Sequence, residues 1–473
     1  MAPSATVFSS TVNLVKTIIG AGLLAIPFAF RADGILLGVI LIVLAAITSG
    51  FGLFVLARSS KVLINPRQTS FFTLCSITYP NVAFLFDFAM FMQCFGVSLS
   101  YLILIGDLFP DLFGGNRKWW VLGSGILILP LTHLRSFDSL KYSSLFGILA
   151  ILYLVAMIVG VYLQGLLWGN EYSPNRGEVR WVEISSFKDL ISTFSIMIFA
   201  FTASMNIFSI IKELKDNSIP NIRRVINYSV GISTVVFILV GTCGYLSFGD
   251  GVDGNVILNY NRNHISTKLA ELALGFILIV SFPLLFHPTR VAFNNMIHWV
   301  HISYQRTSLK SSLPGDDQSL LGSDSRLIAM TVEDEEDREV LGLENGSYQS
   351  LPRGSQLPAE PNEEDDSDTP IVPLDGKRFY LVTWLLIVVL YALALKVGSF
   401  ALVLAIVGAT GSTSISFILP GLFGYKLIGT ESLLRGYPPS RLDKFLKNCS
   451  LALVIYGVAV TGISLLVIIR FGV

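Results

Sequence analysis

The sequence predicts an all-α protein that crosses a membrane many times. Hydrophobic residues make up 52% of its 473 residues and charged residues only 14%, against roughly 25% charged residues in soluble proteins. Apolar runs such as 34–57 and 272–286 approach or reach the about 20 residues that a spanning helix needs. A soluble domain this apolar would expose oversized apolar patches, so we expect a polytopic membrane protein.

Eleven apolar segments are expected to span the bilayer. They are residues 7–30, 34–57, 82–109, 119–134, 143–166, 187–211, 225–248, 266–288, 379–397, 399–424 and 446–470. Helices one to eight fall within 1–302, and helices nine to eleven within 377–473. The segment 303–376 between them is rich in Ser, Asp, Glu and Pro, which predicts a disordered acidic loop.

The distribution of basic residues predicts the orientation of the chain. Most of the 33 Lys and Arg residues fall on one side if the amino terminus is placed in the cytosol, as the positive-inside rule requires. We therefore expect a cytosolic amino terminus, a cytosolic acidic loop and a carboxyl terminus in the lumen or outside. The first ten residues carry no basic group and Lys16 interrupts the apolar run, which indicates a retained helix and not a cleaved signal.

The stretch NLVKTIIGAGLLAIP, residues 13–27, places a lysine inside the first apolar segment. A lysine at a helix centre costs about 2.5–3.5 kcal/mol on insertion scales, and Lys16 lies about 13 Å along the helix from Val7 at 1.5 Å per residue. Asn13, Lys16, Thr17 and Gly20 share one helical face, so this polar stripe is expected to face protein or water. The alternative is a tilted helix whose lysine reaches a lipid headgroup.

The same stretch contains a Gly-Ala-Gly sequence, residues 20–22. GAGLLA fits a dinucleotide-binding pattern, but that pattern needs a preceding strand and an acid about 20 positions on; here the nearest acid is Asp33. We therefore expect no nucleotide cofactor. Close helix packing through small residues is one explanation. The other is a discontinuous helix, in which freed N–H groups meet a substrate carboxylate and freed carbonyls meet a cation.

A transporter with one discontinuous helix is expected to repeat the device, because such folds are built from inverted repeats. Helices one to five would then correspond to helices six to ten. The sixth segment carries a polar interruption at its centre, Thr202-Ala203-Ser204-Met205-Asn206. These residues could instead be ordinary hydrogen-bonding groups between helices, but their position matches the one that the repeat requires.

Five stretches of the sequence, in order along the chain, resemble the amino acid/auxin permease family, and closely its fungal vacuolar members. They are NLVKTIIGAGLLAIP, GVSLSYLILIGD, FAFTASMNIFSIIKELKDNS, SFPLLFHPTR and GATGSTSISFILPGLFGYKLIG. The resemblance covers nearly every expected helix and is lost only in the acidic loop. It implies the inverted 5+5 repeat core of the leucine-transporter type plus one extra helix.

The resemblance also implies where a substrate is expected to bind. Residues of the two breaks are expected to hold the α-carboxylate and amine of an amino acid, with a tyrosine of the third helix closing the site. Carried onto this sequence, the substrate-binding residues are Thr17, Gly20, Ala21, Gly22, Tyr101, Phe199, Thr202 and Ser204.

The position of Lys16 suggests a hypothesis about ion coupling. Sodium-coupled relatives are similar to this chain but carry small or amide residues near Lys16, and they place a hydroxyl cation ligand at the position of Ser281. The Lys16 ammonium would stand where sodium otherwise sits, near Ser281 and next to Asn13 on its own helix. We therefore expect these residues to take part in cation or proton coupling.

The acidic loop contains one candidate sorting signal. In GDDQSLLGSD, Asp316 precedes Leu320 and Leu321 with the spacing of an acidic dileucine motif, which presents a carboxylate and two leucines to a sorting adaptor. The pattern also arises by chance in unselected loop sequence. With the family resemblance, it favours a vacuolar membrane over the cell surface.

These observations favour a secondary transporter that moves neutral amino acids with protons from the vacuole lumen to the cytosol. Its expected partners are an amino acid, protons, the lipid bilayer and sorting adaptors, with no nucleic acid, metal or cofactor. The alternative is an amino acid sensor of the same fold that signals through its cytosolic face. No catalytic residues are expected, since the apolar segments contain no paired metal ligands, G-x-S-x-G elbow or Cys/His arrangement.

Overall fold

The structure, a computed structural model, describes residues 5–63, 66–79, 82–133, 141–168, 177–182, 186–312, 376–430 and 438–471. Apart from one isolated β-bridge between Ala5 and Leu214, the regular structure of these residues is helical. The α-helices are α1 (Val7–Ile18), α2 (Ile26–Asp33), α3 (Ile35–Ser60), α4 (Phe71–Thr78), α5 (Ala83–Phe113), α6 (Arg117–Thr132), α7 (Lys141–Trp168), α8 (Phe187–Ala200), α9 (Ile207–Glu213), α10 (Ile219–Phe248), α11 (Ile265–Ser312), α14 (Gly376–Lys396), α15 (Phe400–Val407), α16 (Leu419–Leu427) and α18 (Arg441–Phe471).

The all-α polytopic class is confirmed. Within the described residues, nine helical spans are long and apolar enough to cross a membrane, and a bent pair formed by Val7–Ile18 and Ala21–Asp33 brings the number to ten. The segment expected at 119–134 is α6, whose 16 residues measure about 24 Å, less than a hydrocarbon core of about 30 Å. The number of eleven spans stays a prediction.

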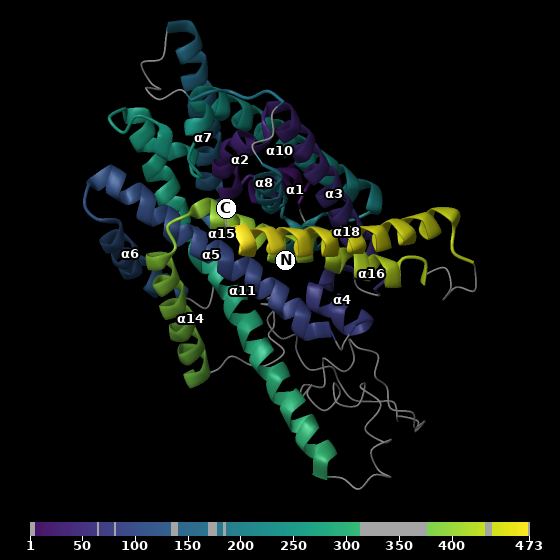
Figure 1. Ribbon diagram of the computed structural model, residues 1–473. Helices are drawn as coiled ribbons and strands as arrows, with labels where there is room; N and C mark the ends of the chain where they lie inside the picture. The colour runs from purple at the N-terminus through teal and green to yellow at the C-terminus, as the bar shows by residue number, and fades with distance from the viewer. Residues whose placement is uncertain are drawn as a thin grey trace.

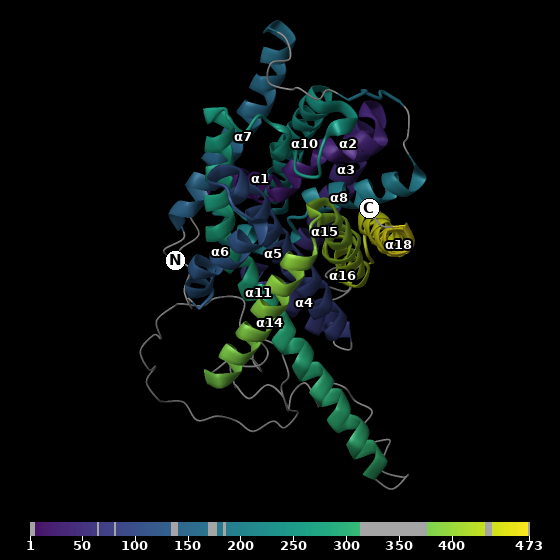
Figure 2. The ribbon, with the colours of Figure 1, turned by 60° about the vertical axis from the view of Figure 1, so that its left-hand side comes forward.

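The helices form one group and, beside it, one long helix pair (Figures 1 and 2). Helices α1, α2, α3, α8 and α10 gather in the upper part of both views, and α18 lies along the outside next to α16. The long α11 runs antiparallel to α5 and forms the most extensive helix pair of the described chain. The two broken helices therefore lie in one group, and the α5–α11 pair passes beside it.

The eighth helix is longer than the sequence predicts. The expected apolar segment ended at residue 288. Instead α11 contains Pro288 and continues to Ser312, overlapping the start of the expected loop. Packing on α5 explains the continuation, since Asn295 and Trp299 donate to the buried carboxyl of Asp87 at 3.4 and 3.1 Å. The proposed sorting residues Asp316, Leu320 and Leu321 lie outside the described residues.

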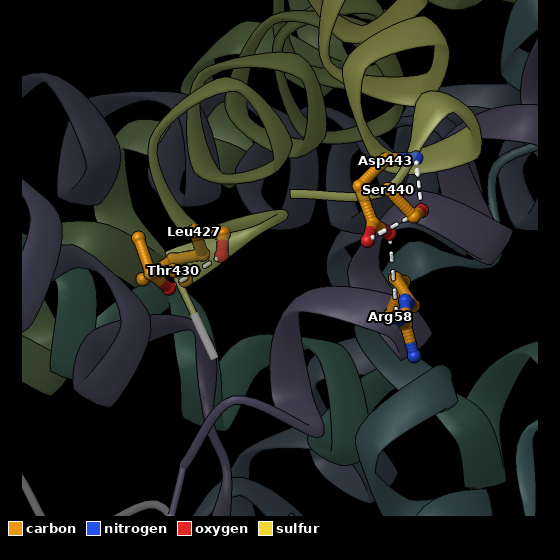
Figure 3. A network of polar contacts seen from close by, with 5 residues as sticks. All are labelled: Arg58, Leu427, Thr430, Ser440 and Asp443. Atoms are coloured by element: carbon orange, nitrogen blue, oxygen red, sulfur yellow. Dashed lines mark hydrogen bonds and ion pairs between the residues drawn. The ribbon is translucent and has the colours of Figure 1, made fainter. Parts of the chain in front are cut away.

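A polar network joins the start of α18 to the end of α3 (Figure 3). Ser440 precedes α18, and its Oγ accepts from the Asp443 N–H at 3.1 Å and donates to Asp443 Oδ2 at 2.8 Å. Asp443 Oδ1 in turn forms an ion pair with Arg58 Nη2 at 3.4 Å. This reciprocal cap satisfies an otherwise unpaired amide at the first turn of the helix, so it fixes where α18 begins.

Removing this cap is expected to destabilise the protein. Loss of an N-cap hydroxyl costs about 0.5–2 kcal/mol, so Ser440→Ala should lower the melting temperature of the purified protein. Arg58→Gln is the matched control, because it removes only a partly exposed ion pair worth about 0–1 kcal/mol. A larger fall in melting temperature for Arg58→Gln than for Ser440→Ala would contradict this assignment.

Candidate functional site

The first helix is interrupted midway, as the sequence predicts. Helix α1 ends at Ile18, Gly20 leaves helical geometry with φ −98° and ψ −148°, and a 3₁₀ turn (η1, Ala21–Ala25) leads into α2. The segments before and after the break are inclined by 46°. In the described part of the chain, the N–H groups of Ala21 and Gly22 have no hydrogen-bond acceptor. These are the donors that a helix start leaves unsatisfied.

The sixth span carries a second break, also where the sequence predicts one. Helix α8 ends at Ala200, Ala203 takes a non-helical conformation with φ −139°, and a 3₁₀ turn (η5, Ser204–Asn206) leads into α9. The Thr202 N–H still bonds the Phe199 carbonyl at 3.0 Å. The N–H groups of Ala203 and Ser204 bond to nothing among the described residues. The two broken helices therefore present equivalent sets of unsatisfied backbone donors.

The two breaks are in direct contact with each other. A Cβ added to Gly22 would lie 2.8 Å from Ala200 Cα, so the first break touches the end of α8 backbone to backbone. On the other side of the contact, Asn206 Nδ2 donates to Thr17 Oγ1 at 2.7 Å. Contacts above and below the breaks thus hold them at one level of the bundle.

Most of the expected substrate-binding residues lie at these breaks. In the first break, Gly20 is exposed, Thr17 and Ala21 are half-buried, and Gly22 is buried. Gly20 lies where a ligand could approach the main chain, because a Cβ at this position would meet only the Thr17 carbonyl, at 3.6 Å.

The second break contributes three expected residues. Phe199 is buried in the last turn of α8. Thr202 Oγ1 donates to the Ile198 carbonyl at 3.1 Å, and Ser204 Oγ donates to Ser416 Oγ at 3.4 Å. Tyr101 is half-buried on α5, a separate helix. The structure thus brings the two breaks together, and the role of Tyr101 in closing the site stays a prediction.

The lysine of the first helix lies against the fifth. The Lys16 Cε lies 3.2 Å from the position that a Gly147 Cβ would take, on α7. A Cβ on Gly147 would be tight against the lysine and would shift its flexible end by a few tenths of an ångström. Asn13 is exposed on α1, and Ser281 is half-buried on α11. The expected pairing of Lys16 with Ser281 stays a prediction.

The tenth helix contributes contacts that the sequence analysis did not single out. Between α15 and α16 the helix widens into π-helical turns at Gly408–Ser412 and Ser414–Ile418, a feature that is frequent at functional sites. Ser412 Oγ donates to Gln93 Oε1 of α5 at 2.8 Å, and a Cβ at Gly408 would lie 1.9 Å from the Ser195 carbonyl oxygen of α8. The run of small residues GATGSTS was the available signal.

At the predicted cytosolic face, the ends of the two broken helices are tied together. The Ala5 N–H bonds the Glu213 carbonyl at 3.1 Å, and the Lys215 N–H bonds the Ala5 carbonyl at 3.0 Å. Arg67 donates to the Lys212 and Lys215 carbonyls at 3.4 and 3.3 Å, which caps the end of α9. Burial and the neighbouring Arg67 cation lower the pKa of Lys61 there, against the opposing effect of Asp216.

Comparisons with known proteins show the family of the chain. A family model described as transmembrane amino acid transporter protein matches residues 3–463. The chain is 49% identical to vacuolar amino acid transporter 7 of Saccharomyces cerevisiae, with 99% of this chain and 98% of the relative covered. It is 34% identical to vacuolar amino acid transporter 6 of the same yeast, with 90% and 91% covered.

One solved structure has a similar fold over its whole length. The crystal structure of MhsT in complex with L-phenylalanine superposes with a TM-score of 0.50, covering 99% of each chain at 10% sequence identity. At this identity the likeness concerns the fold alone. It agrees with the leucine-transporter type of core that the sequence predicts.

Proposed function

Because the chain belongs to the amino acid/auxin permease family, we propose that it is a secondary active transporter of amino acids in the vacuolar membrane. Its relatives are vacuolar amino acid transporters by name and are covered over almost their full length. We further propose that it exports neutral amino acids from the lumen to the cytosol, coupled to protons, by alternating access.

One observation carries this proposal. Backbone N–H groups lack acceptors at both helix breaks, and the two breaks are in contact. The N–H groups of Ala21, Gly22, Ala203 and Ser204 have no acceptor in the described structure. Buried amides without partners are costly, and N–H groups at helix starts attract carboxylates. An amino acid α-carboxylate would satisfy them, and freed carbonyls such as that of Thr17 would accept from its amine.

The side chains around the breaks support a neutral substrate. Thr17, Asn206 and Ser204 are polar but uncharged, and Phe199 is apolar. Lys16 is one turn below the first break and lies against α7, and we assign it, with Asn13 and Ser281, to cation or proton coupling. Amino acids would then be recognised by the groups they share, and the uncharged walls would disfavour acidic and basic side chains.

The proposed location and orientation follow the same relatives and the charge distribution. We propose a multi-pass protein of the vacuolar membrane with a cytosolic amino terminus and a lumenal carboxyl terminus. The acidic loop would then face the cytosol, where a sorting adaptor can bind Asp316, Leu320 and Leu321.

Flux through the purified protein in vesicles tests this function. Vesicles loaded with a mixture of labelled amino acids and an acidic interior are expected to release neutral amino acids faster than vesicles with equal pH on both sides. A protonophore should abolish the difference, and replacing sodium by choline should not change it. Saturable binding without sustained flux would contradict the transporter proposal and favour the sensor of the same fold.

A further inference from the structure

A fully buried carboxyl lies between the two broken helices on the side away from the predicted cytosol. Asp33 is the last residue of α2 and has 0% of its surface exposed. Its Oδ1 lies 2.9 Å from Thr193 Oγ1 on α8. Asp33 lies seven positions after the start of α2 and Thr193 seven positions before the end of α8, so the contact lies about 10 Å along each helix from its broken end. Helix α2 follows the first break and α8 precedes the second, both on the side away from the predicted cytosol. We call these two helices the arms, and they meet at this carboxyl.

The hydroxyl of Thr193 is a weak partner for Asp33, because three acceptors surround it. Its Oγ1 lies 2.8 Å from the Asp189 carbonyl oxygen and 3.1 Å from the Leu190 carbonyl oxygen, as well as 2.9 Å from Asp33 Oδ1. A hydroxyl has one proton and two lone pairs, and within a helix it commonly donates to the carbonyl four residues back. Thr193 Oγ1 donates to Asp33 Oδ1 and shares this single proton with two helix carbonyls, so among the described residues Asp33 has only one shared donor.

The surroundings of Asp33 supply no compensation for a negative charge. Its Oδ2 is buried and has no hydrogen-bond partner in the described structure. Among these residues no cation forms an ion pair with it. Arg31 of its own helix donates to the Val252 carbonyl, and Arg180 of the adjacent segment 177–182 pairs with Asp250 at 2.5 Å.

No described cation on the helices packed against α2 forms an ion pair with Asp33 either. On α8 the negative charge of Asp189 acts on Asp33, and Lys188 is the neighbouring cation. Helix α3 begins with the apolar residues Ile35 and Leu36. On α10, the Tyr245 hydroxyl lies 3.3 Å from Asp250 Oδ1. An ionised carboxyl at Asp33 would therefore be an uncompensated buried charge, which is strongly destabilising.

We propose that Asp33 is a proton-binding site that controls closure of the lumenal side. The carboxylate takes a proton from lumenal water when α2 and α8 are apart, and the neutral acid then accepts from Thr193 Oγ1 as the two arms close. When the arms part, the acid returns its proton to water. An acidic lumen therefore favours closure, and an alkaline one holds the arms apart. This inference rests on the proposed transport function for its physiological role, but the protonation itself does not.

Infrared spectroscopy of the purified protein tests the protonation without any transport. Wild-type protein at neutral pH is expected to show the carbonyl stretch of a protonated carboxylic acid that Asp33→Asn lacks. Thr193→Val should keep this band but shift it, since the hydrogen bond is lost. Identical carboxylic acid bands in wild type and Asp33→Asn would overturn the proposal. If Asp33→Asn does not fold, an unshifted spectrum in Thr193→Val overturns it equally.

Amino acid exchange at varied lumenal pH tests the control of closure. Asp33→Asn mimics the neutral acid, so its exchange rate is expected to lose the dependence on lumenal pH that the wild type shows. Asp253→Asn removes an exposed acid from the same face and should retain the dependence. Full pH dependence in Asp33→Asn would overturn the proposal. A wild-type protein without amino acid flux would instead overturn the transport function, and the infrared result would still stand.

Discussion

Gly22→Ala is expected to lose most amino acid flux. The added Cβ would lie 2.8 Å from Ala200 Cα and 2.9 Å from Ala200 Cβ, closer than real Cβ atoms approach other heavy atoms. The two breaks would have to separate, because backbone atoms at Ala200 cannot rotate away as a flexible side chain does. Overpacking of this kind costs about 1–3 kcal/mol, which corresponds to roughly a 5- to 150-fold effect on an equilibrium.

Gly231→Ala is the matched control for this experiment. It is the same substitution within α10, where an added Cβ meets no other atom within 4 Å. Flux is expected to be unchanged, and stability should rise slightly, because alanine is favoured over glycine in a helix by about 0.8–1.0 kcal/mol. Equal flux in the two variants, measured with equal amounts of folded protein, would show that the contact between the breaks is not needed.

Lys16→Ala is expected to reduce proton-driven flux to the level of vesicles without protein. In the proposed mechanism its ammonium supplies the positive charge beside the first break that sodium supplies in coupled relatives, and alanine leaves this position without a cation. The lysine reaches α7 at Gly147, so its removal also leaves an unfilled space between α1 and α7. Flux is measured with acid-loaded vesicles in the presence and absence of sodium.

Lys118→Ala serves as the control for charge removal, since Lys118 is exposed at the start of α6 and should not affect flux. If sodium restores flux in Lys16→Ala, the lysine would stand in for the ion, which is the strongest support for the hypothesis. Full activity without sodium in Lys16→Ala would refute it.

The sequence predicts both helix breaks because their chemistry is local. Gly20 and Gly22 weaken the first helix within three residues, and the polar residues 202–206 interrupt an apolar segment. Inverted repeats then relate the two positions before any coordinates are considered. The contact of Gly22 with Ala200 and the bond from Asn206 to Thr17 join residues far apart in the chain, so only the structure reveals them.

Features that depend on packing between helices were not predictable. The apolar segment expected to span the membrane ended at residue 288, but α11 continues to Ser312 and contacts Asp87 on α5. The first π-helical turn of the tenth helix lies where Gly408 approaches α8 closely, a contact between residues far apart in the chain. Asp33 stood out in the sequence only as the acid nearest to the glycine motif, because nothing local indicates that Thr193 faces it.

A structure of the protein with a bound neutral amino acid tests the central claim most directly. The account predicts density for the substrate between the two breaks, with its carboxylate within hydrogen-bond distance of the Ala21, Gly22, Ala203 or Ser204 amides. A substrate bound elsewhere, with these four amides still unoccupied, would contradict it.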